Sequence, residues 1–265
     1  MTVSIMLRFT ILGSGSSGNC AYLETEHVRL LVDAGFSAKQ IDLRLGSIGR
    51  SVRDVQAIFL THEHSDHVCG LPVLAKRHGI PVYCNRLTAE YLQPQLPGYV
   101  GWRLFESGAM VELGDLKINS FSVPHDASDP VGFMFNHTLG NIGFLTDLGY
   151  ATKLVIERVM AARALVLEAN HDLRLLQEDT KRPWAVKQRI LSRHGHLSND
   201  AAAEVAAEVV TNAMEDLYLG HLSADCNRPE RARATVSQKL GEKGRPTVRL
   251  HDTAPDKPCE TLVWD

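Results

Sequence analysis

The sequence predicts a mixed α/β fold, a four-layer αββα sandwich formed by one domain over residues 1–265. Two observations favour this fold class. Strand-like segments are followed by helical segments in both halves of the chain, as expected when helices cover the outer faces of two sheets. No linker or low-complexity tract separates the halves, and the 44% of hydrophobic residues can supply a large shared core.

The first half begins with strands and then alternates between strands and helices. Dense aliphatic and β-branched residues between glycine-rich or charged breaks predict strands at residues 7–12, 20–25, 28–35, 57–60 and 81–84. Helical patterns fall between the later strands, at residues 37–49, 70–79 and 87–93.

The second half opens with an antiparallel series over residues 110–126, 131–137 and 141–149, with tight turns at Gly114-Asp115 and Gly140-Asn141. The clearest helix covers residues 198–215, because Ser198 can cap it and small apolar residues follow at helical spacing. The remaining elements are helices at 152–161 and 228–240 and strands at 164–170, 216–223, 246–252 and 260–264.

Composition excludes several classes of protein. The net charge of -3 argues against a surface that binds polyanions everywhere, although a local basic patch remains compatible with it. No apolar run is long enough for a membrane helix, and the N-terminal MTVSIMLRFT lacks the features of a signal peptide. Five scattered cysteines indicate no disulfide framework. We therefore expect a cytoplasmic protein without a membrane partner.

A glycine-rich loop near the start imitates a dinucleotide-binding fingerprint. Residues 13–18 match G-x-G-x-x-G, and Asp33 ends a later strand. The 14 residues between Gly18 and Asp33 are strand-like, however, where a dinucleotide-binding unit needs a helix. The loop is therefore predicted to be a hairpin, whose small residues Ser14 and Ser16 are candidate phosphate contacts.

The strongest functional signal is an H-x-H-x-D-H arrangement directly after the strand at 57–60. It contains His62, His64, Asp66 and His67. Imidazole and carboxylate are ligands that suit zinc, manganese or iron. His62 and His64, two apart in extended backbone, can point to the same side, while Asp66 and His67 would reach a second ion. A histidine-rich polar loop is the alternative, but four candidate ligands within six residues favour metal binding.

This motif resembles the signature of the metallo-β-lactamase fold, and other segments resemble its remaining elements in the expected order. Asp33 in LLVDAG resembles the acidic residue that orients the metal-binding loop. The resemblance implies two divalent ions, zinc or else manganese or iron, that share a hydroxide. The first ion would be held by His62, His64, His125 and Asp147, and the second by Asp66, His67, Asp147 and His221.

Further segments resemble one subgroup of this superfamily, the YycJ/WalJ group. They are SGSSGN, LVDAG, THEHSDH, PHDASDPVGF, TDLG, LEANHD, GHLSN and LGHLS, and they run from about residue 9 to residue 230. The resemblance implies a DNA exonuclease that acts from a 5′ end. More distantly, the chain resembles RNase Z enzymes.

The tetrapeptide G-H-L-S occurs twice, so two histidines compete for one ligand position. We assign His221 to the metal because it ends a predicted strand. His196 and Glu168 resemble the histidine and glutamate that RNase Z-type enzymes place beside the scissile phosphate, and together with Asp66 they are the candidate catalytic residues. A protonated His196 could donate to the leaving oxygen. Alternatively, His196 merely precedes a helix and has no chemical role.

A basic segment follows Glu168. Between residues 181 and 196 it contains five Lys or Arg residues and no acid. Such cations can bind a phosphate backbone, and Trp184 can stack on a base. Alternatively, the segment is a solvated helix face on which Trp184 packs against the protein. Together with Asn170, the candidate substrate contacts here are Lys181, Arg182, Trp184, Lys187, Arg189 and Arg193.

The sequence thus predicts a binuclear metal-dependent phosphodiesterase, a DNA exonuclease in which a metal-bridging hydroxide attacks phosphorus in line. RNA, a small phosphodiester, a cyclic nucleotide or a thioester is an alternative substrate for the same site. A metal-stabilised binding module without activity ranks last, because seven ligands on two ions leave positions open for water. A homo-oligomer is compatible with the sequence.

Overall fold

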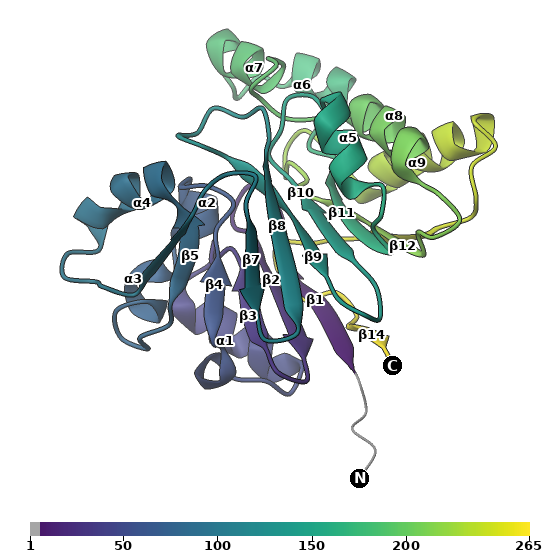
Figure 1. Ribbon diagram of the computed structural model, residues 1–265. Coiled ribbons are helices and arrows are strands. Elements are labelled where there is room, and N and C mark those ends of the chain that lie inside the picture. The colour runs from purple at the N-terminus through teal and green to yellow at the C-terminus, as the bar shows by residue number, and fades with distance from the viewer. Residues whose placement is uncertain (1–5) are drawn as a thin grey trace.

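The computed structural model describes residues 6–265. Two seven-stranded sheets pack face to face and helices cover their outer faces, which confirms the predicted sandwich (Figure 1). The first sheet contains β1 (Leu7–Gly13), β2 (Cys20–Thr25), β3 (Arg29–Val32), β4 (Ala57–Phe59), β5 (Val82–Asn85), β6 (Trp102–Phe105) and β14 (Leu262–Trp264). The second contains β7 (Met110–Leu113), β8 (Leu116–Ser122), β9 (Val131–Asn136), β10 (Ile142–Leu145), β11 (Ala164–Glu168), β12 (Asp216–Gly220) and β13 (Arg249–Asp252).

Both sheets are half antiparallel and half parallel. The first has the order β14-β1-β2-β3-β4-β5-β6 and becomes parallel from β3 onward. The second has the order β13-β12-β11-β10-β9-β8-β7 and is parallel from β10 to β13. In open α/β sheets, binding sites form beyond the carboxyl ends of parallel strands, so this topology directs attention to the loops after β3, β4, β10, β11 and β12.

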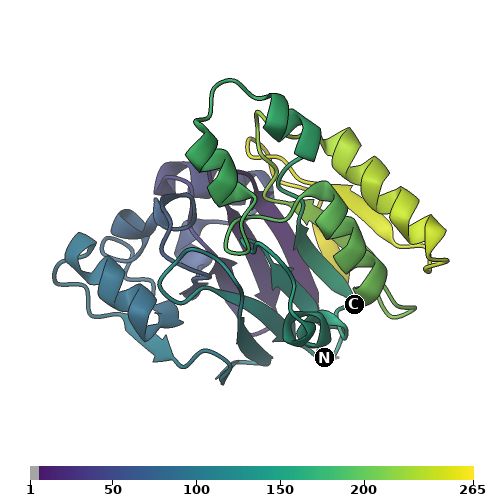
Figure 2. The ribbon, with the colours of Figure 1, turned by 90° about the horizontal axis from the view of Figure 1, so that it is seen from above.

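Helices form the two outer layers (Figure 1, Figure 2). The first sheet is covered by α1 (Ala38–Ser47), α2 (Ser65–Val68), α3 (Leu71–Leu74) and α4 (Arg86–Leu92), with the short 3₁₀ helices η1 (Val52–Asp54) and η2 (Gln93–Gln95). The second is covered by α5 (Lys153–Val159), α8 (Asn199–Val209) and α9 (Pro229–Glu242). Above it lie α6 (Leu173–Glu178) and α7 (Trp184–Ile190).

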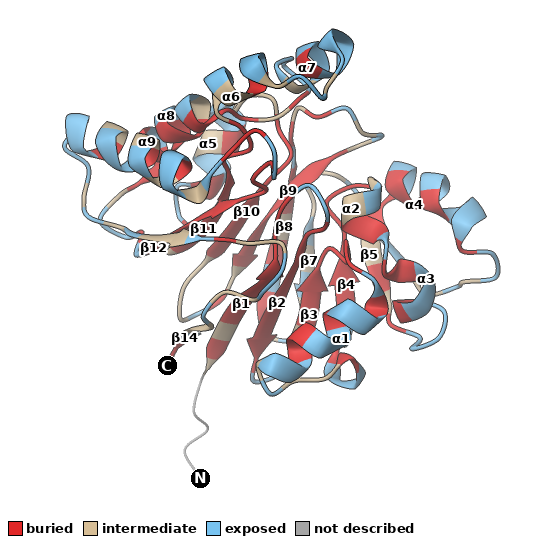
Figure 3. Ribbon diagram, turned by 180° about the vertical axis from the view of Figure 1, so that it is seen from behind, coloured by how far each residue is buried: buried red, intermediate tan, exposed pale blue. Residues whose placement is uncertain are grey.

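The central core lies between the sheets, where the buried faces of the strands meet (Figure 3). Phe59 of β4 packs edge to face against Phe133 and Phe135 of β9, with ring centroids 5.8 and 6.1 Å apart. Phe9 of β1 meets Tyr218 of β12 in the same way at 5.7 Å. Edge-to-face aromatic pairs add to the stabilisation from burial, so these contacts fix one sheet against the other.

Most predicted elements are present, with a few corrections. The predicted helix at 198–215 stops at Val209, because Val210 has extended backbone angles; its cap is present, since Ser198 Oγ accepts a bond of 3.1 Å from Ala201 N. The helix at 70–79 shortens to Leu71–Leu74, with turns in place of its second half. Elements β6 and α6 had no strong sequence pattern.

The glycine-rich loop joins two antiparallel strands. Because β1 and β2 pair directly, no helix follows residues 13–18, and the loop belongs to a hairpin as predicted. Within residues 6–265, no helix combines the length and the apolar character that crossing a membrane requires. The N-terminal segment discussed above lies partly outside the described residues, which begin at Met6.

Candidate metal centre and active site

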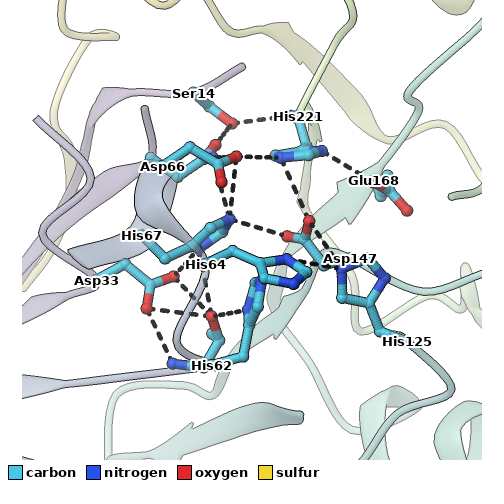
Figure 4. A network of polar contacts seen from close by, with 12 residues as sticks. Ser14, Asp33, His62, His64, Asp66, His67, His125, Asp147, Glu168 and His221 are labelled. Atoms are coloured by element: carbon cyan, nitrogen blue, oxygen red, sulfur yellow. Dashed lines mark hydrogen bonds and ion pairs between the residues drawn. The ribbon is translucent and has the colours of Figure 1, made fainter. Parts of the chain in front are cut away.

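The predicted ligand residues converge at one edge of the sandwich, where both sheets end (Figure 4). The first sheet supplies them from the segment after β4, with Asp66 and His67 in α2, and the second sheet supplies them from the segments after β8, β10 and β12. Nine residues lie here: His62, His64, Asp66, His67, His125, Asp147, Glu168, His196 and His221. Residues up to 159 positions apart in the chain thus face one another because the carboxyl ends of the strands meet.

Three residues that follow β3, β10 and β12 adopt left-handed backbone. Asp33, Asp147 and His221 have φ of 59°, 59° and 56°. Among the described residues they are the only ones other than glycine with positive φ. Such a conformation is unfavourable for a residue with a side chain and tends to occur at functional sites. All three belong to the site: Asp147 and His221 are candidate ligands, and Asp33 contacts His67.

Four histidine rings are each held by a contact at Nδ1. His67 Nδ1 lies 2.8 Å from Asp33 Oδ2, and His221 Nδ1 lies 3.0 Å from Glu168 Oε1. His125 Nδ1 lies 3.0 Å from the backbone oxygen of Gly195, and His62 Nδ1 lies 3.0 Å from Thr61 Oγ1. Donation from Nδ1 leaves Nε2 unprotonated and free to bind a metal, which is the usual arrangement around metal-binding histidines.

The free ring nitrogens face Asp147, which lies between two groups of donors. Its Oδ2 is 3.3 Å from His67 Nε2, and its Oδ1 is 3.3 Å from His221 Nε2 and 3.9 Å from His125 Nε2. One group joins His62, His64 and His125, and the other joins Asp66, His67 and His221. Within each group, one ligand atom per residue lies within 4.8 Å of the others.

The chemistry of these donors fits divalent cations. His62 Nε2 and Asp147 Oδ2 are buried and have no hydrogen-bond partner among the described residues, which is unfavourable unless a cation binds them. Burial keeps the pKa of His62 well below its usual value, so its ring stays neutral. Burial would also lower the pKa of His221, but Asp147, Asp66 and Glu168 raise it to about 10, so without an ion the ring carries a second proton at Nε2, which a bound cation would replace.

Glu168 connects the metal centre to His196. Its Oε1 lies 2.7 Å from His196 Nδ1 and 3.0 Å from His221 Nδ1, while its Oε2 accepts the backbone N–H groups of Leu148 and Leu197. Burial would raise the pKa of Glu168, but the two histidines lower it, so the carboxylate stays ionised. Burial opposes protonation of His196 as well, yet Glu168 raises the pKa of His196 above its usual value. His196 lines the cleft and is a candidate proton donor.

A hydrogen-bonded loop that sequence patterns did not resolve supports the first sheet's ligands. Asn19, of the SGSSGN segment, donates through Nδ2 to Asp66 Oδ2 at 3.4 Å and accepts from Ser14 Oγ at 2.9 Å. Gly35 packs against the backbone of Asp66 so closely that a side chain would collide with it. Asp33 also accepts from Thr61 N at 2.9 Å, which fixes the start of the metal-binding loop.

Three of the predicted substrate contacts instead hold the protein together. Ser14 is buried and its Oγ accepts from His221 N at 2.8 Å. Asn170 is buried and donates to the backbone oxygen of His221 at 2.9 Å. Lys187 is buried and donates through Nζ to the carbonyl oxygens of Gln177, at 2.8 Å, and Asp179. The sequence could not show these inward orientations, because each residue type is more often exposed.

The other candidate contacts are exposed, except for the half-buried Arg182, but most are paired. Lys181 and Arg182 bond to Asp225 at 2.8 and 3.0 Å, and Arg193 stacks on the ring of Tyr150. Trp184 is 63% exposed on α7. Of the nine predicted contacts, only Ser16 and Arg189 line the cleft at the metal centre.

The cleft has a volume of about 650 Å³, within the range of small-molecule binding sites. His64, Asp66, Asp147, His196 and His221 line one end of it. Much of the remaining lining is apolar and comes from the helices of the first sheet and the segment after η2, with Val68, Leu71, Pro72, Leu92 and Leu96. The metal centre and this apolar lining therefore share one cleft.

Comparisons with known proteins agree with this fold. The model of the "Beta-lactamase superfamily domain" family matches residues 28–221. The chain is 40% identical over 260 residues to the exodeoxyribonuclease YycJ of Bacillus anthracis, covering 96% of this chain and 98% of the relative. It is 39% identical to the exodeoxyribonuclease WalJ of Streptococcus pneumoniae, covering 95% and 96%. The metallo-β-lactamase fold protein YhfI of Bacillus subtilis superposes with a TM-score of 0.74 at 17% identity, covering 98% and 99%.

The fold and the ligand cluster define a metal-dependent hydrolase of the β-lactamase superfamily, and the chain belongs to that superfamily. Within it, the chain belongs to the family of the exodeoxyribonucleases YycJ and WalJ, as the identity over nearly the full length of both proteins shows. Divalent metal ions are implied by this membership and by the clustered histidine and aspartate ligands.

Proposed function

We propose that the chain is a DNA exonuclease that digests from a 5′ end and uses two divalent ions, zinc or else manganese or iron. One observation carries the proposal: two groups of three donors flank the buried Asp147 and open into a single cleft. The relatives at about 40% identity are named exodeoxyribonucleases, which supports DNA as the substrate.

The proposed ligands follow the observed groups. His62, His64 and His125 would hold one ion, while Asp66, His67 and His221 would hold the other, and Asp147 would bridge them. When bound, the two ions supply an activated water and stabilise negative charge on the phosphoryl oxygens. Asp66 is half-buried and lines the cleft. Its proposed catalytic role is to bind a metal ion on the side that faces the substrate.

The chain's own residues would complete the reaction. Glu168 holds His196 by its Nδ1, so the opposite ring nitrogen, Nε2, is available to donate a proton to the leaving oxygen. Asp33 and Glu168 keep His67 and His221 in the tautomer that leaves Nε2 free. Arg189 of α7 lines the cleft and is positioned to bind a phosphate once it leaves Asp126.

A second candidate is hydrolysis of a small phosphodiester. One observation favours it: several cations near α7 already pair with carboxylates, among them Lys181 and Arg182 with Asp225, and are therefore less available to a long polyanion.

End-labelled DNA, end-labelled RNA and bis-p-nitrophenyl phosphate, each with manganese or zinc, separate the two functions. The proposal expects mononucleotides released progressively from the 5′ end of DNA and no activity with EDTA. Hydrolysis of the small ester without degradation of either polymer would favour the second candidate. Internal cuts in DNA would contradict exonuclease action.

A further inference from the structure

The apolar end of the cleft has no role in holding the metal ions. It is lined by Val68, Leu71, Pro72, Tyr91, Leu92 and Leu96. These side chains come from α2, α3, α4 and the segment after η2, all on the outer face of the first sheet (Figure 1). Because these residues line the same cleft as the metal centre, a substrate whose phosphate lies at the ions could extend a neighbouring group toward them.

Tyr91 is the aromatic side chain that this end presents. It is 55% exposed, although a tyrosine ring buries considerable apolar area when it packs. Leu87, one helical turn earlier on α4, is 40% exposed. An exposed aromatic ring at the wall of a cleft provides a flat apolar surface for a planar ligand.

The position of α4 relative to the metal centre is fixed by Glu63, which lies between two proposed ligands in the sequence. Glu63 Oε1 accepts from Ser128 N and Ser128 Oγ, both at 2.7 Å, and Oε2 accepts from Thr88 Oγ1 at 3.5 Å. Asn85 caps α4 through Thr88 N at 2.9 Å. The metal-binding loop and the helix that carries Tyr91 are thus parts of one bonded assembly.

We propose that this apolar end is a nucleobase subsite, in which the ring of Tyr91 stacks on the base of the terminal nucleotide. The inference rests on the proposed nuclease function and names the part of DNA that the cleft selects. A base offers an apolar face and a polar edge, which match Tyr91 and the amide of Gln95 at the same end. The anionic backbone would continue toward Arg189 of α7, which lines the same cleft.

Stacking on Tyr91 has a consequence for duplex DNA. A base that enters this end of the cleft leaves its partner, because the edge used for pairing faces Gln95 and the cleft walls. The terminal nucleotide therefore separates from the opposite strand before cleavage. An end that is already unpaired avoids that step, so a terminal mismatch should be digested faster than a matched end.

The test combines variants with altered DNA ends. Tyr91→Ala should raise the KM for DNA with a normal 5′ end about tenfold or more with little change in kcat, and Tyr91→Phe should restore it, because stacking needs the ring and not the hydroxyl. The matched control is Leu43→Ala on α1, which is 57% exposed but does not line the cleft, and it should leave KM unchanged. Fluorescence anisotropy in EDTA measures the affinity for an oligonucleotide without cleavage. This affinity should fall in Tyr91→Ala and stay near the wild-type value in Tyr91→Phe and Leu43→Ala.

DNA with an abasic 5′-terminal residue removes the other partner of the proposed stacking contact, so the enzyme variant and the altered DNA together form a double-mutant cycle. The wild-type KM should rise for this DNA, and Tyr91→Ala should add nothing further, because both changes remove the same contact. An equal effect of Tyr91→Ala on normal and abasic ends would overturn the subsite while leaving the nuclease function intact. Failure of the wild type to digest any DNA would instead overturn the proposed function, and the subsite with it.

Discussion

Glu168→Gln is expected to weaken metal binding although the change preserves the shape of the side chain. The carboxylate accepts four hydrogen bonds: from the backbone of Leu148 and Leu197 at 3.1 and 3.0 Å, and from His196 and His221 at 2.7 and 3.0 Å. A glutamine has one acceptor oxygen, so two of these four donors must face an N–H group instead. Each buried donor without a partner costs about 1–3 kcal/mol, or roughly 2–6 kcal/mol for the pair.

The effect on the metal depends on whether the one acceptor oxygen of the glutamine faces the two backbone N–H groups or the two histidine rings. If the backbone pair keeps it, His221 can accept from the amide only by moving its proton to Nε2, which removes the lone pair directed at the metal centre. We expect metal affinity to fall by about 10- to 100-fold, the usual effect of removing such a partner. The assay is competition with a chromophoric chelator, on protein whose folding is verified by circular dichroism. Glu168→Asp retains the charge and should lose less. Unchanged affinity in folded Glu168→Gln would refute this role for the carboxylate.

The remaining predictions concern other parts of the molecule. His196→Ala should retain the metal content and lower kcat, whereas His221→Ala should lose metal; elemental analysis with kinetics compares them, and the reverse pattern would exchange the two G-H-L-S assignments. Gly35→Ala should reduce metal content and melting temperature together, because its side chain would collide with the Asp66 backbone, and a normal melting curve with normal metal content would be evidence against that contact. Asp216 is buried against Arg249 and His251. Burial opposes ionisation of its carboxyl group, but the two partners lower its pKa to about 2 from 3.8. The ionised carboxylate therefore stabilises the fold above pH 4, and this contribution is lost as the pH falls toward 2. Urea unfolding should therefore show a loss of about 2 kcal/mol in Asp216→Asn at pH 7 and almost none at pH 2, and an equal loss at both would contradict it.

The fold and the ligand cluster could be predicted because their signals are local or accumulate at fixed spacing. Alternation of strand and helix patterns indicated the layers, and strand β4 followed directly by His62 and His64 indicated a metal site. Strand ends are recognisable in a sequence, and the ends of parallel strands meet at one edge of a sheet. Asp33, His125, Asp147 and His221 lie far from that motif in the sequence, and they were assigned to the site through the resemblance to the metallo-β-lactamase fold.

The substrate contacts were less predictable because the sequence does not encode which way a polar side chain turns. Lys187 belongs to a basic segment, yet its ammonium group bonds to backbone oxygens inside the protein. Ser14 lies in a loop suited to phosphate, yet it holds His221. Tyr91 was placed in a predicted helix, and only the packing of α4 beside the metal-binding loop brings it to the cleft. These orientations depend on tertiary contacts that no local pattern reports.

Titration of metal-free protein with manganese, followed simultaneously by metal content and release of nucleotides from 5′-labelled DNA, tests the central claim most directly. Two groups of donors that share Asp147 predict that full activity requires two ions per chain, with little activity at one. Activity that saturates at one ion per chain, or that persists in EDTA, would contradict the two-ion centre.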